Sequence, residues 1–218
     1  MNLTRRDMLL YSTSLAAFSA APMAWADTAT TSPAPTADSI PDYGIGDPNA
    51  KVKIVEYLSF TCPHCEHFHA NVYPLLKSEY IDKGLVRLEF HEVYFDRYGL
   101  WGAMLARCGG EMRYVGIVDM LYNKQAQWAG NSDPTVAVDE LKKIGLIAGI
   151  SNAEADKCLQ DQAMAKALVA HYQANLAKDY DKDHPFKGTP SFIINDVRYG
   201  NMAWSDMKKI IDDDLAKA

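Results

Sequence analysis

Residues 54–65 read IVEYLSFTCPHC. The apolar, β-branched and aromatic run over residues 54–60 is typical of a buried strand, and a helical pattern follows it. A strand that turns into a helix at this point places Cys62 at the helix N-terminus, where free backbone N–H groups and the helix dipole favour a thiolate over a thiol. Pro63 suits the first helical position, because it has no N–H to leave unpaired and its φ is already helical.

The spacing of Cys62 and Cys65 is that of a redox-active pair. Cys65 comes one helical turn after Cys62 and can close a disulfide with it at little cost in strain. A thiolate attacks disulfides and is also a good leaving group, so the pair is suited to thiol–disulfide exchange. A protonated His64 would stabilise the Cys62 thiolate further. Strand, Cys-Pro-His-Cys and helix together predict a thioredoxin-like redox motif.

Two other interpretations of the motif exist. Cys62 and Cys65 could be half of a zinc site, with His67 and His69 as further ligands, or they could be two packing cysteines. Histidines in this position are most often solvated residues of a helix surface, and no second ligand pair at zinc-finger spacing follows in the sequence. We therefore expect no metal, and no cofactor other than the redox-active disulfide itself.

The first 26 residues have the pattern of a bacterial export signal. Arg5 and Arg6 precede a mostly apolar stretch, which ends in the small-x-small cleavage site at residues 24–26. Paired arginines favour the twin-arginine route, although the general secretory route also accepts them. The apolar stretch is too short to span a bilayer. The sequence therefore predicts a signal peptide over residues 1–26 and a periplasmic protein.

The composition after the signal limits the classes of partner. The full chain has a net charge of −6, and removal of the signal, which carries Arg5, Arg6 and Asp7, leaves −7; this acidity argues against nucleic acid. Residues 27–42 are rich in Thr, Ala, Pro and Ser and are expected to form a flexible tether. The remainder is long enough for one domain with a sizeable core, or for one domain that carries an insertion.

The order of the predicted elements defines the fold class. Strands are predicted over residues 51–60, 84–94, 191–195 and 197–199, and helices over residues 62–80, bent near Pro74, and 204–216. Helix signals dominate the long stretch between the second and third strands. They are the helix start Asp133-Pro134, the capping box Ser151–Glu154, and an apolar stripe from Met164 to Tyr180.

This order predicts an α/β protein with a thioredoxin fold and an inserted all-helical domain. The thioredoxin-like domain would comprise residues 43–96 and 184–218, and the helical domain residues 97–183. We see no internal repeat in the sequence.

Two further motifs are GDPNA at residues 46–50 and KGTPSFIIN at residues 187–195. With these motifs, the cysteine motif and the helical insertion, nearly all of the chain after the signal resembles the DsbA family of exported thiol–disulfide oxidoreductases. The resemblance implies that Cys62 is the exposed nucleophile and Cys65 its buried partner. It also implies that the pair rests oxidised, passes its disulfide to reduced, newly exported proteins, and is reoxidised by a membrane quinone reductase of the DsbB type.

Thr189-Pro190 is a candidate substrate-binding loop. An X–Pro bond can be cis at modest cost, and an exposed Thr189 backbone could pair with an extended substrate chain. Taken alone, such a dipeptide is most often a simple turn. The resemblance implies a cis-proline that faces the two cysteines.

Glu56 is a candidate proton-transfer residue. It shares a strand face with Ile54, and a carboxyl group on an apolar face is desolvated, which favours its protonated form. Such a group could pass a proton to or from Cys65, and the family has a buried acid at the matching position. The alternatives are that Glu56 reaches solvent at a strand edge or pairs with a lysine such as Lys53.

Cys108 and Cys158 are candidates for a second, structural disulfide. An even number of cysteines in an exported protein favours such a bond. The alternative is two buried free thiols that serve only in packing.

The function that these patterns favour is that of an exported oxidase, which introduces disulfides into newly exported proteins. A monomer is expected, because dimeric isomerases of this fold usually carry a dimerisation region before the thioredoxin core and only a short tether stands there. The alternatives are a reductase or isomerase that uses the same cysteines, or a metal-binding or chaperone-like module.

Overall fold

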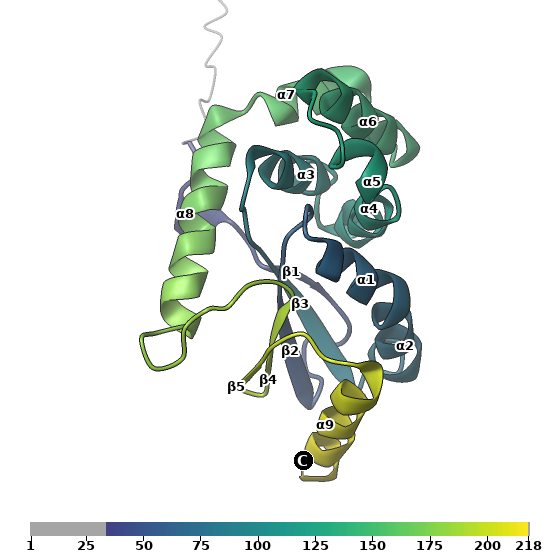
Figure 1. Cartoon of the computed structure of the whole chain (residues 1–218), viewed down its shortest axis with the longest axis vertical. Coiled ribbons are helices and arrows are strands. Elements are labelled where there is room, and N and C mark those ends of the chain that lie inside the picture. The colour runs from purple at the N-terminus through teal and green to yellow at the C-terminus, as the bar shows by residue number, and fades with distance from the viewer. Residues whose placement is uncertain (1–33, 218) are drawn as a thin grey trace, which may run out of the picture. The chain divides into compact units, whose positions relative to one another are not determined.

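A five-stranded mixed sheet lies at the centre of residues 34–217, the part of the chain that the computed structural model describes (Figure 1). Its strands are β1 (Tyr43–Ile45), β2 (Val52–Leu58), β3 (Val86–Glu92), β4 (Ser191–Ile194) and β5 (Val197–Tyr199). The strand order is β1-β3-β2-β4-β5, with β2 parallel to β3 and every other neighbouring pair antiparallel. The predicted signal peptide, residues 1–26, and residues 27–33 of the predicted tether lie outside the described residues.

The helices follow the predicted order. After β2 come α1 (Pro63–Asn71), α2 (Tyr73–Leu76) and the π-helical turn η2 (Lys77–Ile81), and α9 (Trp204–Lys217) ends the described chain. Between β3 and β4 lie α3 (Arg97–Cys108), α4 (Glu111–Asn123), α5 (Gln125–Trp128), α6 (Pro134–Ile147), α7 (Asn152–Leu159) and α8 (Gln162–Asp179). The thioredoxin fold with a helical insertion is therefore confirmed. None of the helices within residues 34–217 has the length and apolarity required to cross a membrane.

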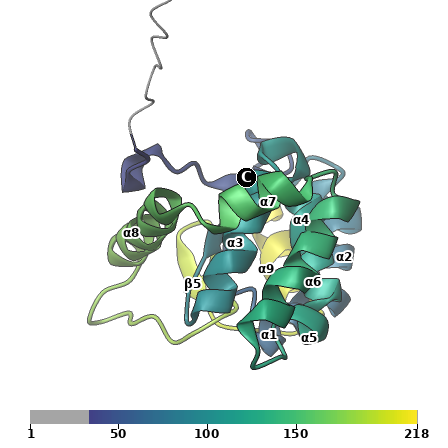
Figure 2. The ribbon, with the colours of Figure 1, turned by 90° about the horizontal axis from the view of Figure 1, so that it is seen from above.

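Helices α3 to α7 of the insertion form a cluster at one end of the sheet, whereas α8 runs along one of its faces. Helices α4, α6 and α7 pack around α3, and α8 lies on the other side of α3 (Figure 2). Local capping sets where two of them begin. Asp133 accepts a hydrogen bond from the Thr135 N–H (2.8 Å) at the start of α6, and Ser151 and Glu154 form the predicted capping box at the start of α7.

Successive residues of β2 point to opposite faces of the sheet, as the two-residue period of a strand requires. Glu56 meets His69 of α1 on one face, whereas the Tyr57 hydroxyl donates to the Asp179 carboxylate (2.6 Å) at the end of α8 on the other. Helices α1 and α8 therefore cover opposite faces of the sheet, as Figure 1 shows. The cysteine motif lies at the N-terminus of α1, on the side of the sheet that this helix covers.

Residues 34–42 lie ahead of β1 and are the described part of the expected flexible tether. These residues pack against the rest of the protein, so the expectation of a flexible tether is wrong for them. Ile40 is buried in the core, and the His171 ring of α8 lies 3.1 Å from the Ala37 carbonyl oxygen and 2.7 Å from the Asp42 carboxylate. Strand β1 follows directly and pairs with β3, which the sequence patterns did not predict. No local pattern predicts these contacts, because the partners lie far along the chain, at His171 for Ala37 and Asp42 and at Phe90 for Tyr43.

Candidate functional site

Cys62 is the N-cap residue of α1, and Pro63 occupies the first helical turn. Strand β2, the central strand of the sheet, ends at Leu58, and the short turn that follows leads to Cys62 beyond the carboxyl-terminal end of that strand. The Cys62 side chain is partly exposed, so that a second molecule can reach its sulfur. His64 is exposed beside it.

Cys65 lies one turn further along α1 and is completely buried. The Ser59 backbone N–H points at its sulfur, at 3.5 Å. The two thiols therefore have different environments. One is open to solvent at the helix N-terminus, and the other is enclosed by the core.

This difference separates the acidities of the two thiols. The Cys62 pKa falls from its ordinary value of 9.0 to about 5, chiefly because the Cys65 thiol hydrogen-bonds to the Cys62 sulfur, with further help from the backbone N–H groups of Cys65 and His64. Burial raises the pKa of Cys65 well above the ordinary range, and hydrogen bonding to Cys62 and the charge of Glu56 add to the effect. At neutral pH the reduced pair thus carries one thiolate, on Cys62, and one thiol, on Cys65.

The Thr189-Pro190 peptide bond is cis, and the loop that contains it faces Cys62. The Cys62 thiol lies 3.3 Å from the Thr189 carbonyl oxygen, and Pro190 is buried. The structure thus brings together residues that lie 127 positions apart in the sequence.

The helical insertion holds the turn that carries Cys62. The Gln125 side chain of α5 donates to the carbonyl oxygens of Phe60 (2.9 Å) and Cys62 (3.0 Å). The Tyr122 hydroxyl of α4 donates to the Ser59 carbonyl oxygen (3.2 Å). Sequence reasoning missed both contacts, because nothing in the pattern of α4 or α5 distinguishes these polar side chains from surface residues.

Glu56 is completely buried, and its partner is His69, with the ring Nε2 at 3.2 Å from both carboxylate oxygens. The alternatives of a strand-edge position and of a pair with Lys53 are excluded by this geometry. His67 is exposed, as expected of a helix-surface residue, but the same expectation is wrong for His69, which is only 7% exposed. Its spacing from Cys65 puts it one turn further along the inner face of α1, which is the signal that could have revealed it.

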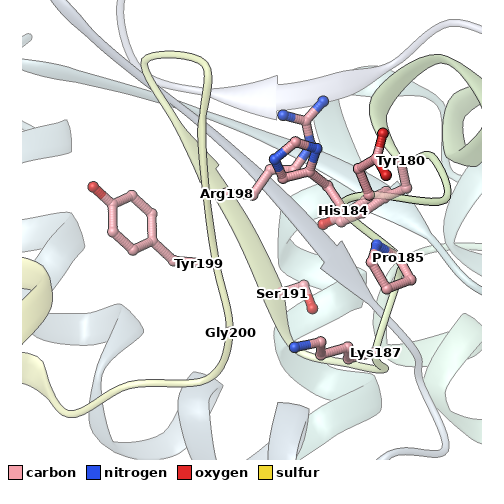
Figure 3. A pocket seen from close by; sticks show the side chains of 9 residues that line it. Tyr180, His184, Pro185, Lys187, Ser191, Arg198, Tyr199 and Gly200 are labelled. Atoms are coloured by element: carbon pink, nitrogen blue, oxygen red, sulfur yellow. The ribbon is translucent and has the colours of Figure 1, made fainter.

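A surface cavity of about 240 Å³ opens beside the loop that carries Pro190. Figure 3 shows Lys187 and Ser191 at one end of this cavity and Tyr180, His184 and Arg198 together at the other. The guanidinium group of Arg198 lies over the Tyr180 ring, 5.8 Å from its centroid. The lining of this cavity thus combines the cationic groups of Lys187 and Arg198 with the carboxylate of Asp183.

Cys108 and Cys158 are joined in a disulfide that links the end of α3 to α7. The bond stands apart from Cys62 and Cys65, which are both free thiols. Within residues 34–217, no group of three or more His, Cys, Asp or Glu side chains is arranged to hold a metal ion.

The acidic Cys62 predicts a pH dependence for the reduced protein. Because its pKa is about 5 in the folded state and 9.0 when unperturbed, the thiolate contributes stability that is complete above pH 9.0, declines as the pH falls, and is lost below about pH 5. The rate of alkylation of Cys62 by iodoacetamide should follow the thiolate and be half-maximal near pH 5, with Cys62→Ser as the blank. A midpoint between pH 8 and 9 would contradict this assignment.

The fold and the cysteine pair define a thioredoxin-fold protein equipped for thiol–disulfide exchange. The sequence profile of the thioredoxin family matches residues 38–213. The chain therefore belongs to the thioredoxin family, and within it to the group of DsbA-like proteins and proteins named as protein-disulfide oxidoreductases.

Three comparisons place the chain in this group. A Rickettsia typhi protein named as a protein-disulfide oxidoreductase is 31% identical over 172 residues, which are 78% of this chain and 61% of that protein. A Bacillus cereus protein named disulfide bond formation protein D is 30% identical, over 79% of this chain and 78% of its own. The crystal structure of Wolbachia pipientis alpha-DsbA1 has a TM-score of 0.72 and 26% identity, and the match covers 81% of this chain and 92% of that one. The chain spans only about three fifths of the length of the Rickettsia relative.

Proposed function

We propose that this protein donates disulfide bonds to reduced polypeptides after their export to the periplasm. The observation that carries the proposal is the geometry of the cysteine pair, with a partly exposed Cys62 at the N-terminus of α1 and a fully buried Cys65, and the low pKa of Cys62 agrees with it. An acidic thiolate stabilises the reduced pair, and a stable reduced state makes the corresponding disulfide a strong oxidant.

The exchange proceeds in two displacements. A substrate thiolate attacks Cys62 Sγ, the Cys62–Cys65 bond breaks, and Cys65 leaves with the electron pair and takes up a proton. A second substrate thiolate then attacks the substrate sulfur of the mixed disulfide and releases Cys62 as a thiolate. The substrate loses two electrons and gains a disulfide, and the protein gains both electrons. The low pKa of Cys62 favours this last release.

The loop around Pro190 is proposed to orient the substrate chain. The Thr189 backbone lies beside the Cys62 sulfur, so an extended polypeptide that pairs with it, as an added strand would, holds its own cysteine in line with Cys62. The cavity beside this loop, with Lys187 and Arg198 on its wall, is proposed to contact a further part of the substrate chain. Glu56 is proposed to supply the proton that Cys65 takes up.

The place and partners of the reaction are part of the same proposal. The N-terminal pattern of paired arginines, apolar stretch and small-x-small site supports export and cleavage after Ala26. A membrane quinone reductase of the DsbB type would reoxidise the dithiol, and the protein would act as a monomer. The name of the Bacillus cereus relative, which refers to disulfide bond formation, supports this direction of reaction.

Equilibration with glutathione buffers of graded composition tests the direction. The mature protein is incubated in each buffer, and the states of Cys62 and Cys65 are read by thiol trapping and peptide mass mapping, which keeps the Cys108–Cys158 pair separate. An oxidase is expected to stay reduced until the buffer is strongly oxidising. A pair that is already oxidised in strongly reducing buffer would make the protein a reductase and overturn the proposal.

A further inference from the structure

The buried pair of Glu56 and His69 raises the question of where the proton of Cys65 comes from. Glu56 is the charged group whose field acts on the Cys65 thiol, and the Glu56 side chain has no exposed surface. A carboxyl group sealed in this way cannot exchange protons with solvent directly. Each catalytic cycle nevertheless requires Cys65 to gain one proton and later to lose it, so the carboxyl group needs a connection to the outside.

His69 provides that connection. Its Nε2 contacts both oxygens of Glu56, at 3.2 Å. The residue also lines a surface cavity of about 340 Å³ between α1, α2 and α4. An imidazole can accept a proton at one nitrogen and release one from the other, which makes it the natural side chain to join a buried acid to a hydrated cavity.

Two buried polar atoms of residues that line this cavity have no hydrogen-bond partner among the described residues. They are Nδ1 of His69 and the hydroxyl oxygen of Tyr73. The two rings are adjacent, with centroids 4.9 Å apart, and Tyr73 also lines the cavity. Buried polar groups in folded proteins are almost always satisfied, by ordered water where protein groups are missing, and the cavity is large and polar enough to hold water molecules.

The groups that face His69 from the surrounding elements fit a proton exit. They are Glu56 from β2, Glu66 from α1, Tyr73 from α2, Lys77 from η2, and Asp119 and Tyr122 from α4. The Tyr122 ring stacks on the imidazole, with centroids 4.2 Å apart, and fixes its plane. Burial raises the pKa of Asp119, against the opposing effect of His69 and Lys77, so that its carboxyl group can take part in proton exchange at the cavity.

We propose that His69 carries protons between Glu56 and water in the cavity bounded by Tyr73 and Asp119, and thereby reprotonates Glu56 in each cycle. The inference rests on the proposed function. When the Cys62–Cys65 bond breaks, Glu56 gives its proton to the Cys65 thiolate. The neutral His69 ring then takes up a proton at Nδ1 from water in the cavity, and the imidazolium so formed passes its Nε2 proton to Glu56, which leaves a neutral ring protonated at Nδ1. During reoxidation Cys65 returns its proton by the reverse path and attacks Cys62 Sγ.

His69→Gln tests this role in the full-length mature protein. The glutamine amide can still donate a hydrogen bond to Glu56, but it cannot accept a proton at one atom and release one from another. The readout is a rapid-mixing experiment in which the oxidised protein reacts with a reduced two-cysteine peptide and is quenched in acid from pH 4 to 8. The rate of the step that releases Cys65 is expected to fall about 100-fold at pH 7. His67→Gln changes an exposed histidine of the same helix and should match the wild type.

Three readouts separate a proton carrier from a structural residue. The alkylation midpoint of Cys62 and the glutathione equilibrium should stay at their wild-type values in His69→Gln, since a proton carrier changes rates and not equilibria. The rate losses of Glu56→Gln and His69→Gln should not add in the double variant, because both residues act on one path. Added imidazole should restore part of the rate in His69→Ala.

The outcomes are distinct from a failure of the proposed function. If the wild type exchanges with the peptide and His69→Gln exchanges equally fast, or if the two losses add fully, this inference is overturned and the proposed function stands. If the wild type does not exchange, the proposed function itself fails. Should His69→Gln not fold, Tyr73→Phe decides the matter. Loss of its hydroxyl should slow the same step about fivefold, and an unchanged rate would overturn the exit through the cavity.

Discussion

Cys62→Ser is expected to lose disulfide exchange by at least about 1000-fold, because the sulfur that is attacked in the first displacement and leaves in the second is removed, and a serine hydroxyl is neither acidic nor able to form an S–S bond. The other three cysteines cannot replace it. Cys65 is completely buried, and Cys108 and Cys158 are bonded to each other. The measurement is oxidation of a reduced two-cysteine peptide, followed by mass spectrometry under single-turnover conditions.

Cys65→Ser is the matched control for this result. It keeps the exposed Cys62 but removes the thiol that would resolve a mixed disulfide, so covalent adducts with substrate should accumulate on non-reducing gels. A chaperone-like protein without turnover would behave alike in both variants. Residual exchange in Cys62→Ser above a few per cent of the wild-type rate would show that another group does the chemistry.

Removal of the second disulfide should produce the largest loss of stability. Cys108 and Cys158 are 50 residues apart in sequence, and closing a loop of that length lowers the entropy of the unfolded chain enough to stabilise the fold by about 4 kcal/mol. Cys108→Ala combined with Cys158→Ala should lower the free energy of unfolding by this amount, measured by urea denaturation under non-reducing conditions. The alkylation midpoint of Cys62 should not change, because the bond joins α3 to α7 and leaves the turn at Cys62 intact.

Two comparisons keep this result interpretable. The first comparison is made in proteins that carry Cys62→Ser, which removes the contribution of the Cys62–Cys65 bond. In these proteins, chemical reduction of the Cys108–Cys158 bond should give the same midpoint urea concentration of unfolding as the substitutions Cys108→Ala and Cys158→Ala. A loss below about 1 kcal/mol would mean that the disulfide strains the folded state as much as it restricts the unfolded chain.

The local patterns of the sequence predicted most of the fold. Strand β2 and the start of α1 follow from an apolar run and a proline after an N-cap residue, and α7 follows from the capping box of Ser151 and Glu154. These signals act through residues within one helical turn or one strand pair of each other, so they can be read without knowing the rest of the chain. The same holds for much of the acidity of Cys62, whose pKa is lowered chiefly by the thiol of Cys65 one turn further along the same helix.

The partners of the site residues were decided by the tertiary structure alone. Glu56 had three candidate environments in the sequence, and only the packing of α1 on β2 puts the His69 ring against its carboxylate. Likewise, Gln125 reaches the turn at Cys62 only because the helical insertion folds back over the sheet. Residues that are distant in sequence meet through the register of strands and the crossing of helices. Both are set by the packing of the whole core, and no local pattern of side chains encodes them.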